Sequence, residues 1–274
     1  MKNGHVSLGE TRMQYVSFGH GARGLVVLPG LSDGLATVEG KAWILSQPYL
    51  RYLRDYTVHL FSRKDRMPEG YTIEDMADDQ AAAMDALGIR RACVLGVSQG
   101  GMIAQTLALR HPERVEKLIL AVTASWANDT LRRAVDDWIQ MAQRGDHRAL
   151  MVDTAERMYS EAYLGRSRAL FPLLAKVTKP RSYERFLRNA EAILAFDLRG
   201  QLGEIRCPTL ILAGSEDRTL GTEAAEELHR EICGSELFVY PGLGHGAYEE
   251  AKDFYARVFD FCGREDPERD GRRL

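Results

Sequence analysis

The sequence has few cysteines and no long apolar run. No two of the four cysteines in the 274 residues are close enough to form a CxxC metal or redox pair. Each lies in an apolar stretch, so we expect reduced, buried structural thiols in a cytoplasmic protein. No segment reaches about 18 consecutive apolar residues, and residues 1–10 lack the apolar centre of a signal peptide, so neither a membrane span nor a leader is expected. The cysteines are Cys93, Cys207, Cys233 and Cys262.

An excess of positive charge is also missing. The chain has 36 Lys and Arg against 39 Asp and Glu, a formal net charge of −3, so it lacks the basic surface of a nucleic-acid-binding protein. Its 45% hydrophobic and 27% charged residues are typical of a globular protein and exclude a disordered chain. The length allows one large α/β domain or two smaller ones.

Short apolar runs alternate with helical patterns along most of the chain. Residues 25–28 and 92–97 have the pattern of strands that are buried on both faces. Between them, residues 72–87 carry apolar side chains at helical spacing, with Thr72 as the N-cap and Gly88 at the end. This alternation predicts an α/β fold with a mostly parallel, doubly wound sheet and helices on both faces. The other expected strands are 13–18, 56–61, 118–122, 208–213 and 236–240, and the other expected helices are 35–56, 99–110, 222–232 and 249–261.

The alternation stops at Trp126 and resumes about 75 residues later. Residues 126–201 contain no convincing strand and carry amphipathic helical patterns. We therefore predict a helical insertion, 126–201, within a core formed by 1–125 and 202–263. Residues 264–274 are almost all charged, and we expect them to form a disordered tail.

The pentapeptide Gly96-Val97-Ser98-Gln99-Gly100 lies between a predicted buried strand and a predicted helix. A GxSxG sequence in that position is typical of a nucleophile elbow, a strained turn that lifts the serine hydroxyl off the sheet edge. Side chains two residues before and after the serine would collide, which explains both glycines. Ser98 is therefore the predicted nucleophile.

A serine hydroxyl becomes nucleophilic when a base takes its proton, and a histidine on a loop can do this. His245 follows the last predicted strand, between two glycines that we expect to free the imidazole to approach another loop. A carboxylate must then orient the imidazole, and Asp217 follows a strand at the edge of the sheet where reactive loops gather. Glu216 and Asp129 are the rival acids. The other histidines, for which structural or solvated roles are expected, are His5, His20, His59, His111, His147 and His229.

The oxyanion formed in such a reaction needs two backbone amide donors. We predict the amide of Gln99, directly after the nucleophile, and the amide of Leu31, in the loop after the strand 25–28. This chemistry needs no metal and no organic cofactor.

On these residues, over about 12–262, the sequence resembles the α/β-hydrolase fold family, of the serine-nucleophile, cap-bearing esterase type. The order Ser98, Asp217, His245 is the order of that family. The resemblance implies that the insertion follows the sixth strand and forms a helical cap that shapes the substrate pocket. The common His-Gly of the oxyanion loop is replaced by Pro29-Gly30, and the longer glycine run of many lipases is absent, so a long-chain lipase is not expected.

The resemblance implies a hydrolase, and a carboxylic ester or related acyl bond of a small molecule is the leading substrate. The same triad also serves C–C bond hydrolysis, perhydrolysis and acyl transfer, and some relatives of the fold are non-catalytic receptors or scaffolds. Neither nucleic acid nor a membrane is an expected partner, and the sequence predicts no oligomeric state. The basic segment 62–66 is expected to be solvated.

Overall fold

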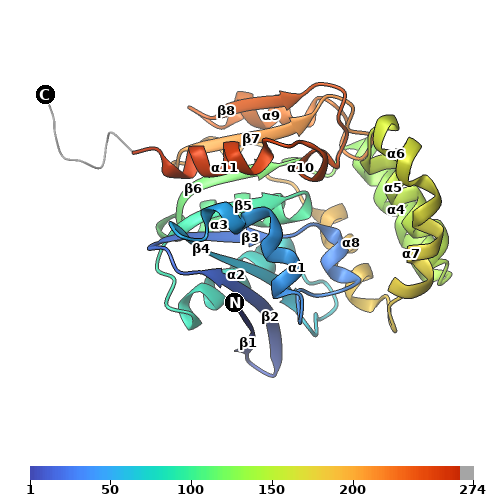
Figure 1. The fold of residues 1–274 in the computed structure, drawn as a ribbon, viewed down its shortest axis with the longest axis horizontal. Coiled ribbons are helices and arrows are strands. Elements are labelled where there is room, and N and C mark those ends of the chain that lie inside the picture. Colours follow the sequence, from blue (N-terminus) through green and yellow to red (C-terminus); the bar gives the residue numbers. More distant parts are fainter. Residues whose placement is uncertain (266–274) are drawn as a thin grey trace, which may run out of the picture.

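The computed structural model describes residues 1–265, in which eight strands form one sheet (Figure 1). The order across the sheet is β1-β2-β4-β3-β5-β6-β7-β8. The pairs β1–β2 and β2–β4 are antiparallel, and all other neighbouring strands are parallel. The strands are β1 Lys2–Leu8, β2 Thr11–Gly19, β3 Arg23–Leu28, β4 Tyr56–Lys64, β5 Ala92–Val97, β6 Val115–Ala121, β7 Thr209–Gly214 and β8 Glu236–Tyr240.

Helices connect the parallel strands and cover both faces of the sheet, as the alternation predicted. The α-helices are α1 Ala42–Ser46, α2 Ile73–Ala86, α3 Gln99–Arg110, α4 Asp129–Gln143, α5 His147–Met158, α6 Glu161–Ser167, α7 Phe171–Thr178, α8 Glu184–Ala195, α9 Ala224–Glu231, α10 Ala247–Glu250 and α11 Phe254–Gly263. Short 3-10 helices are η1 Leu31–Gly34, η2 Gln47–Tyr52, η3 Pro112–Arg114, η4 Arg168–Leu170 and η5 Leu202–Glu204.

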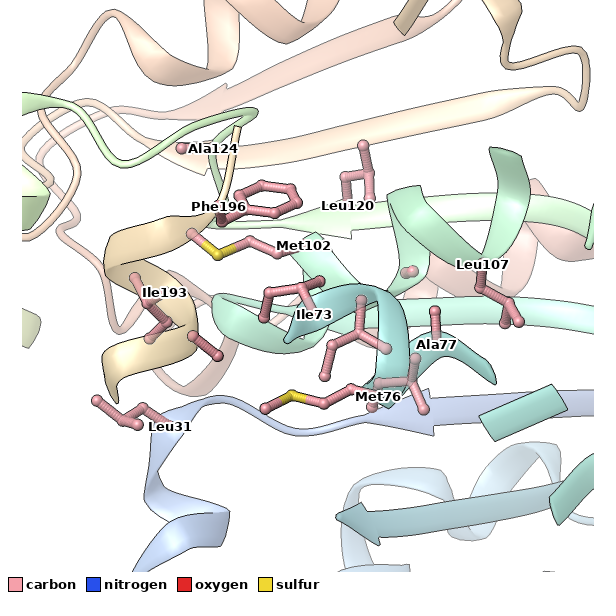
Figure 2. Packing of buried hydrophobic residues seen from close by; sticks show 14 of the residues in the cluster. Leu31, Ile73, Met76, Ala77, Met102, Leu107, Leu120, Ala124, Ile193 and Phe196 are labelled. Carbon is pink, nitrogen blue, oxygen red and sulfur yellow. The ribbon is translucent and has the colours of Figure 1, made fainter. Parts of the chain in front are cut away.

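Two buried apolar clusters hold these layers together. One contains side chains of α2, α3, α8 and α9, and the other contains side chains of α1, η2 and α11 on the opposite face. Figure 2 shows part of the first cluster, in which Leu31 lies near Ile193 of α8, and Met102 of α3 lies beside Phe196. Residues 29–35, which we call the oxyanion-side loop because they carry the predicted donor Leu31, are therefore packed against a helix of the insertion as well as against the core.

The prediction differs from the structure at two places in the N-terminal third. The strand β1 is missing from the prediction, because Val6 is its one buried side chain and no alternating pattern marks it. The single helix predicted over 35–56 is replaced by two short pieces, α1 and η2, and residues 35–41 are not helical. Gly40 takes a left-handed conformation (φ +72°) before α1, and Pro48, which has no N–H, lies in the first turn of η2.

The segment between β6 and β7 is helical, from α4 to α8. Trp126 and Asp197 form an isolated antiparallel bridge, so the chain enters and leaves this insertion at one place. Figure 1 shows α4, α5, α6 and α7 together at one end of the molecule. Of the predicted tail 264–274, Arg264 is ion-paired with Glu236, and residues 266–274 lie outside the described residues.

All four cysteines are free thiols, but they are not all buried. Cys93 and Cys262 are buried, Cys207 is partly buried, and Cys233 is exposed. The expectation of four buried thiols is therefore wrong at Cys233, which lies in the turn between α9 and β8 rather than inside an element. No helix within residues 1–265 combines the length and apolar character needed to cross a bilayer.

Candidate active site

Ser98 lies in a sharp turn between β5 and α3. Its backbone has φ 54° and ψ −120°, a conformation that is rare and strained for a residue with a side chain. A Cβ on Gly96 would lie 2.3 Å from the Gly100 carbonyl oxygen, and a Cβ on Gly100 would lie 1.9 Å from the Leu28 carbonyl oxygen. Both glycines are thus required by close backbone contacts, as expected from the sequence.

The structure brings Ser98, His245 and Asp217 together from three loops. The distance from His245 Nε2 to Ser98 Oγ is 2.9 Å, and the distance from His245 Nδ1 to Asp217 Oδ2 is 2.8 Å. The other carboxylate oxygen, Oδ1, accepts hydrogen bonds from the amides of Thr219 and Leu220, at 2.8 and 2.9 Å. These bonds fix the Asp217 side chain, and with it the orientation of the imidazole. His245 and Asp217 are 4% and 6% exposed, so both groups are shielded from water.

The rival residues lie elsewhere. Asp129 is the first residue of α4, and the carboxylate that contacts His245 is that of Asp217 rather than that of its neighbour Glu216. Several other histidines have their own partners, His111 with Asp78, His147 with Thr178 and His229 with Ser235.

The loop at Gly30 and Leu31 runs beside the serine. A Cβ on Gly30 would lie 3.3 Å from Ser98 Cβ and 3.8 Å from Ser98 Oγ. Leu31 begins η1 and Gln99 begins α3, so the amides of both residues stand in first helical turns, where no earlier carbonyl is available. Among residues 1–265, neither amide has a hydrogen-bond acceptor within the chain. Two amide donors are thus available near the hydroxyl.

A cavity of about 220 Å³ opens on Ser98 and His245. Apart from Ser98 and His245, its lining comes from the oxyanion-side loop, the insertion and α10. The polar groups are those of Ser32, Thr154, Tyr159, Tyr248 and Glu249. The larger apolar lining residues are Leu31, Leu35, Trp138, Met151, Met158, Phe171 and Phe186.

Comparison with known proteins gives the family. A family model described as alpha/beta hydrolase fold matches residues 55–252. The chain belongs to the alpha/beta hydrolase family. The AB hydrolase superfamily protein YisY of Bacillus subtilis (strain 168) is 32% identical over 202 residues, which cover 70% of this chain and 74% of that protein.

Two further similarities span nearly the whole alpha/beta hydrolase chain. A 2-hydroxy-6-oxononadienedioate/2-hydroxy-6-oxononatrienedioate hydrolase of Paraburkholderia xenovorans (strain LB400) is 27% identical over 266 residues, covering 92% of this chain and 91% of that protein. The crystal structure of MGS-M2, an alpha/beta hydrolase from a Medee basin deep-sea metagenome library, matches with a TM-score of 0.82. It is 22% identical and covers 96% of this chain and 98% of that one, which supports the fold.

A buried charge cluster lies behind the oxyanion-side loop of this alpha/beta hydrolase. The Arg63 guanidinium donates to Gln99 Oε1 at 2.9 Å and lies 4.0 Å from Asp33 Oδ2. Arg63 is 1% exposed, so the expectation that the segment 62–66 is solvated is wrong at this residue. Burial lowers the pKa of Arg63 to about 10, and the charge of Asp33 opposes that shift. The cluster therefore fixes the Gln99 side chain next to Ser98.

Arg185 of α8 joins the insertion to the same cluster. Its guanidinium donates to the Asp33 carbonyl oxygen at 2.6 Å, to Asp33 Oδ2 at 3.0 Å and to the Arg63 carbonyl oxygen at 3.1 Å. The residues of this cluster come from three distant segments, and no sequence pattern points to Asp33 or Arg185. Arg63 could have drawn attention because it stands at the end of a strand, on the edge that carries Ser98.

The segment between α5 and α6 is bound to the His245 loop. The Gly246 amide donates to the Met158 carbonyl oxygen at 2.7 Å, and Tyr159 Oη donates to a Glu249 carboxylate oxygen. A Cβ on Gly244 would lie 2.7 Å from the Met158 carbonyl oxygen, and a Cβ on Gly246 would lie 2.7 Å from Tyr159 Cδ1. The two glycines beside the histidine thus leave room for the insertion.

Proposed function

We propose that this alpha/beta hydrolase cleaves carboxylic esters or related acyl bonds of small uncharged molecules through Ser98, His245 and Asp217. The observation that carries the proposal is the continuous chain of contacts, 2.9 Å from Ser98 Oγ to His245 Nε2 and 2.8 Å from His245 Nδ1 to Asp217 Oδ2. Both distances lie within the range of hydrogen bonds that transfer a proton between a nucleophile and its base.

In the proposed reaction, His245 Nε2 takes the Ser98 proton while Ser98 Oγ attacks the acyl carbonyl carbon. The amides of Leu31 and Gln99 donate hydrogen bonds to the oxyanion, and each such donor contributes about 3 kcal/mol of transition-state stabilisation. The imidazolium then gives its proton to the leaving alcohol, and the acyl group remains on Ser98. Water, deprotonated by the same imidazole, attacks the acyl carbon, and the proton returns to Ser98 as the acid leaves.

The helices α4, α5, α7 and α8 supply most of the apolar cavity wall, and we propose that residues 126–201 act as the cap of this site. Within the described residues, the cavity lining contains no Lys or Arg, and Glu249 is its one carboxylate. Such a wall favours an uncharged substrate, because an anionic group would be desolvated without a cationic partner. A cavity of about 150 Å³ accommodates benzene, so about 220 Å³ suits a small aromatic or short-chain ester.

C–C bond hydrolysis is the second candidate. The relative from Paraburkholderia xenovorans is named for that kind of reaction, and the match covers 91% of its length. Its named substrate is a dicarboxylate, whereas the cavity lining here has no cationic side chain among the described residues. This difference favours the uncharged ester.

The test compares short p-nitrophenyl esters with a charged dicarboxylate ester and a vinylogous diketone. We expect turnover of the short neutral esters, little turnover of the other two, and loss of all turnover in Ser98→Ala. A fluorophosphonate should label the wild type at Ser98 and leave Ser98→Ala unlabelled. Absence of labelling in the folded wild type would favour a non-catalytic binding protein, and equal activity of Ser98→Ala would refute the nucleophile.

A further inference from the structure

An apolar stripe lies on the outer side of the insertion. Leu170, Leu173, Leu174 and Val177 are 53%, 57%, 44% and 81% exposed. They belong to α7 and the residue before it, and their spacing of three and four residues places them on one side of the helix. We call these four residues the α7 face. Scattered exposed apolar side chains are ordinary, but four on one helical stripe form a patch of the kind that marks a protein or membrane interaction site.

The inner side of α7 already has a partner. Phe171 lines the active-site cavity, and Ala175 is buried. The helix therefore packs on the molecule through one side and presents the α7 face on the other. Folding alone does not require these outward apolar side chains, since polar residues there would leave the inner contacts unchanged.

Positive charge surrounds the α7 face. Residues 162–183 contain five Lys or Arg and no Asp or Glu. Arg168 is ion-paired with Glu156 and Glu161, and the other four cations have no ion-pair partner among residues 1–265. All five are exposed at the surface. They are Arg166, Arg168, Lys176, Lys179 and Arg181.

We propose that the α7 face docks onto an anionic lipid surface. A helix with an apolar stripe and flanking Lys and Arg is suited to lie in a bilayer interface, with its apolar side chains inserted and its cations among anionic headgroups. A second copy of the chain is the other candidate occupant. Pairing two α7 faces around a twofold axis would bring both sets of cations together, and the charges therefore oppose it.

This proposal departs from our expectation that no membrane is a partner, which rested on the lack of an apolar span. It concerns binding at the surface, and it stands or falls independently of the proposed ester hydrolysis. Because Phe171 of α7 lines the active-site cavity, docking of α7 would place the cavity next to the lipid.

The experiment is co-sedimentation of the full chain with vesicles of equimolar phosphatidylcholine and phosphatidylglycerol, compared with pure phosphatidylcholine. We expect sedimentation with the anionic vesicles only, and release when salt is raised. Leu173→Ser combined with Val177→Ser should weaken binding at least about a hundredfold, because two side chains leave the apolar phase. Lys176→Gln combined with Arg181→Gln should weaken it about fivefold for each charge removed.

The matched control is Trp43→Ser combined with Ile44→Ser. These two side chains are 69% and 61% exposed on α1, so the control removes a comparable apolar surface away from α7. We expect unchanged vesicle binding, and thermal unfolding midpoints near the wild-type value for all three double variants.

Four outcomes would overturn the proposal: no sedimentation with either vesicle, equal sedimentation with both, wild-type binding by the Leu173 and Val177 variant, or equal loss in the α1 control. Gel filtration without lipid tests the second copy. A wild-type dimer that becomes a monomer when Leu173 and Val177 are replaced would assign the α7 face to self-association instead.

Discussion

Replacing Asp217 with asparagine tests whether this side chain decides which nitrogen of His245 carries the proton in the proposed triad. Both carboxylate oxygens are engaged in the folded protein. Oδ1 accepts from the amides of Thr219 and Leu220 at 2.8 and 2.9 Å, and Oδ2 lies 2.8 Å from His245 Nδ1. An asparagine has one oxygen and one NH2 group, so only one of these two positions can remain an acceptor.

The backbone donors decide which position that is. Two N–H groups fixed by the chain keep the amide oxygen, and the NH2 group of Asp217→Asn then faces His245 Nδ1. The imidazole must accept there and carry its proton on Nε2, where it meets Ser98 Oγ and cannot act as a base. We expect kcat to fall about 10⁴-fold, or about 5.5 kcal/mol, as for the corresponding wrong tautomer in serine proteases.

The assay is kcat for a short p-nitrophenyl ester, with the thermal unfolding midpoint as a check on folding. Glu216→Gln is the matched control, because it neutralises the neighbouring carboxylate and leaves the His245 contact intact. We expect it to keep near-normal kcat. A folded Asp217→Asn enzyme within about tenfold of the wild type would refute the tautomer reasoning, and a large loss in Glu216→Gln would move the acid to that residue.

Three further outcomes are expected. Gly246→Ala places a methyl group 2.7 Å from Tyr159 Cδ1, so steady-state kinetics should give a lower kcat and calorimetry a lower unfolding midpoint; unchanged values would show that the loop adjusts freely. Arg185→Met removes the hydrogen bonds to Asp33, and urea unfolding should show a loss of about 2–3 kcal/mol, with a reduced kcat; an unaltered kcat would separate the cluster from the site. Burial lowers the pKa of His59 from 6.5 to about 4. The unfolded chain therefore binds the proton first as pH falls, and up to about 3 kcal/mol of stability is lost between about pH 6.5 and 4. Urea titrations should show a shallower loss in His59→Gln, and an equal slope would assign the effect to other groups.

The turn at Ser98 could be predicted because its constraint is local. Gly96 and Gly100 must lack side chains wherever a strand, a serine and a helix meet at this angle, so five residues and their neighbours carry the information. His245 and Asp217 could be selected because each follows a predicted strand at one edge of a parallel sheet. The architecture followed from the same alternation of elements.

The cluster around Arg63 could not be predicted in the same way. A basic run after a strand usually faces water, and only the folded chain places Asp33 and Arg185 against it. The cavity also stayed beyond sequence reasoning, since helices of the insertion supply most of its wall through packing that no short pattern specifies. The predicted helix over 35–56 is broken into two short pieces, which shows how one proline and one glycine override a helical composition.

The hydrogen bonds between the α5–α6 segment and the His245 loop limit how the insertion can be exchanged between relatives. A chimaera that receives residues 126–201 from a relative would lose the contacts from Tyr159 to Glu249 and from Ser160 to Glu250, unless the donor brings its own 244–250 loop as well. To transfer the substrate range of a relative, residues 126–201 and the 244–250 loop should therefore be exchanged together. Libraries that vary the helices and the loop jointly should retain more active members than libraries that vary either alone.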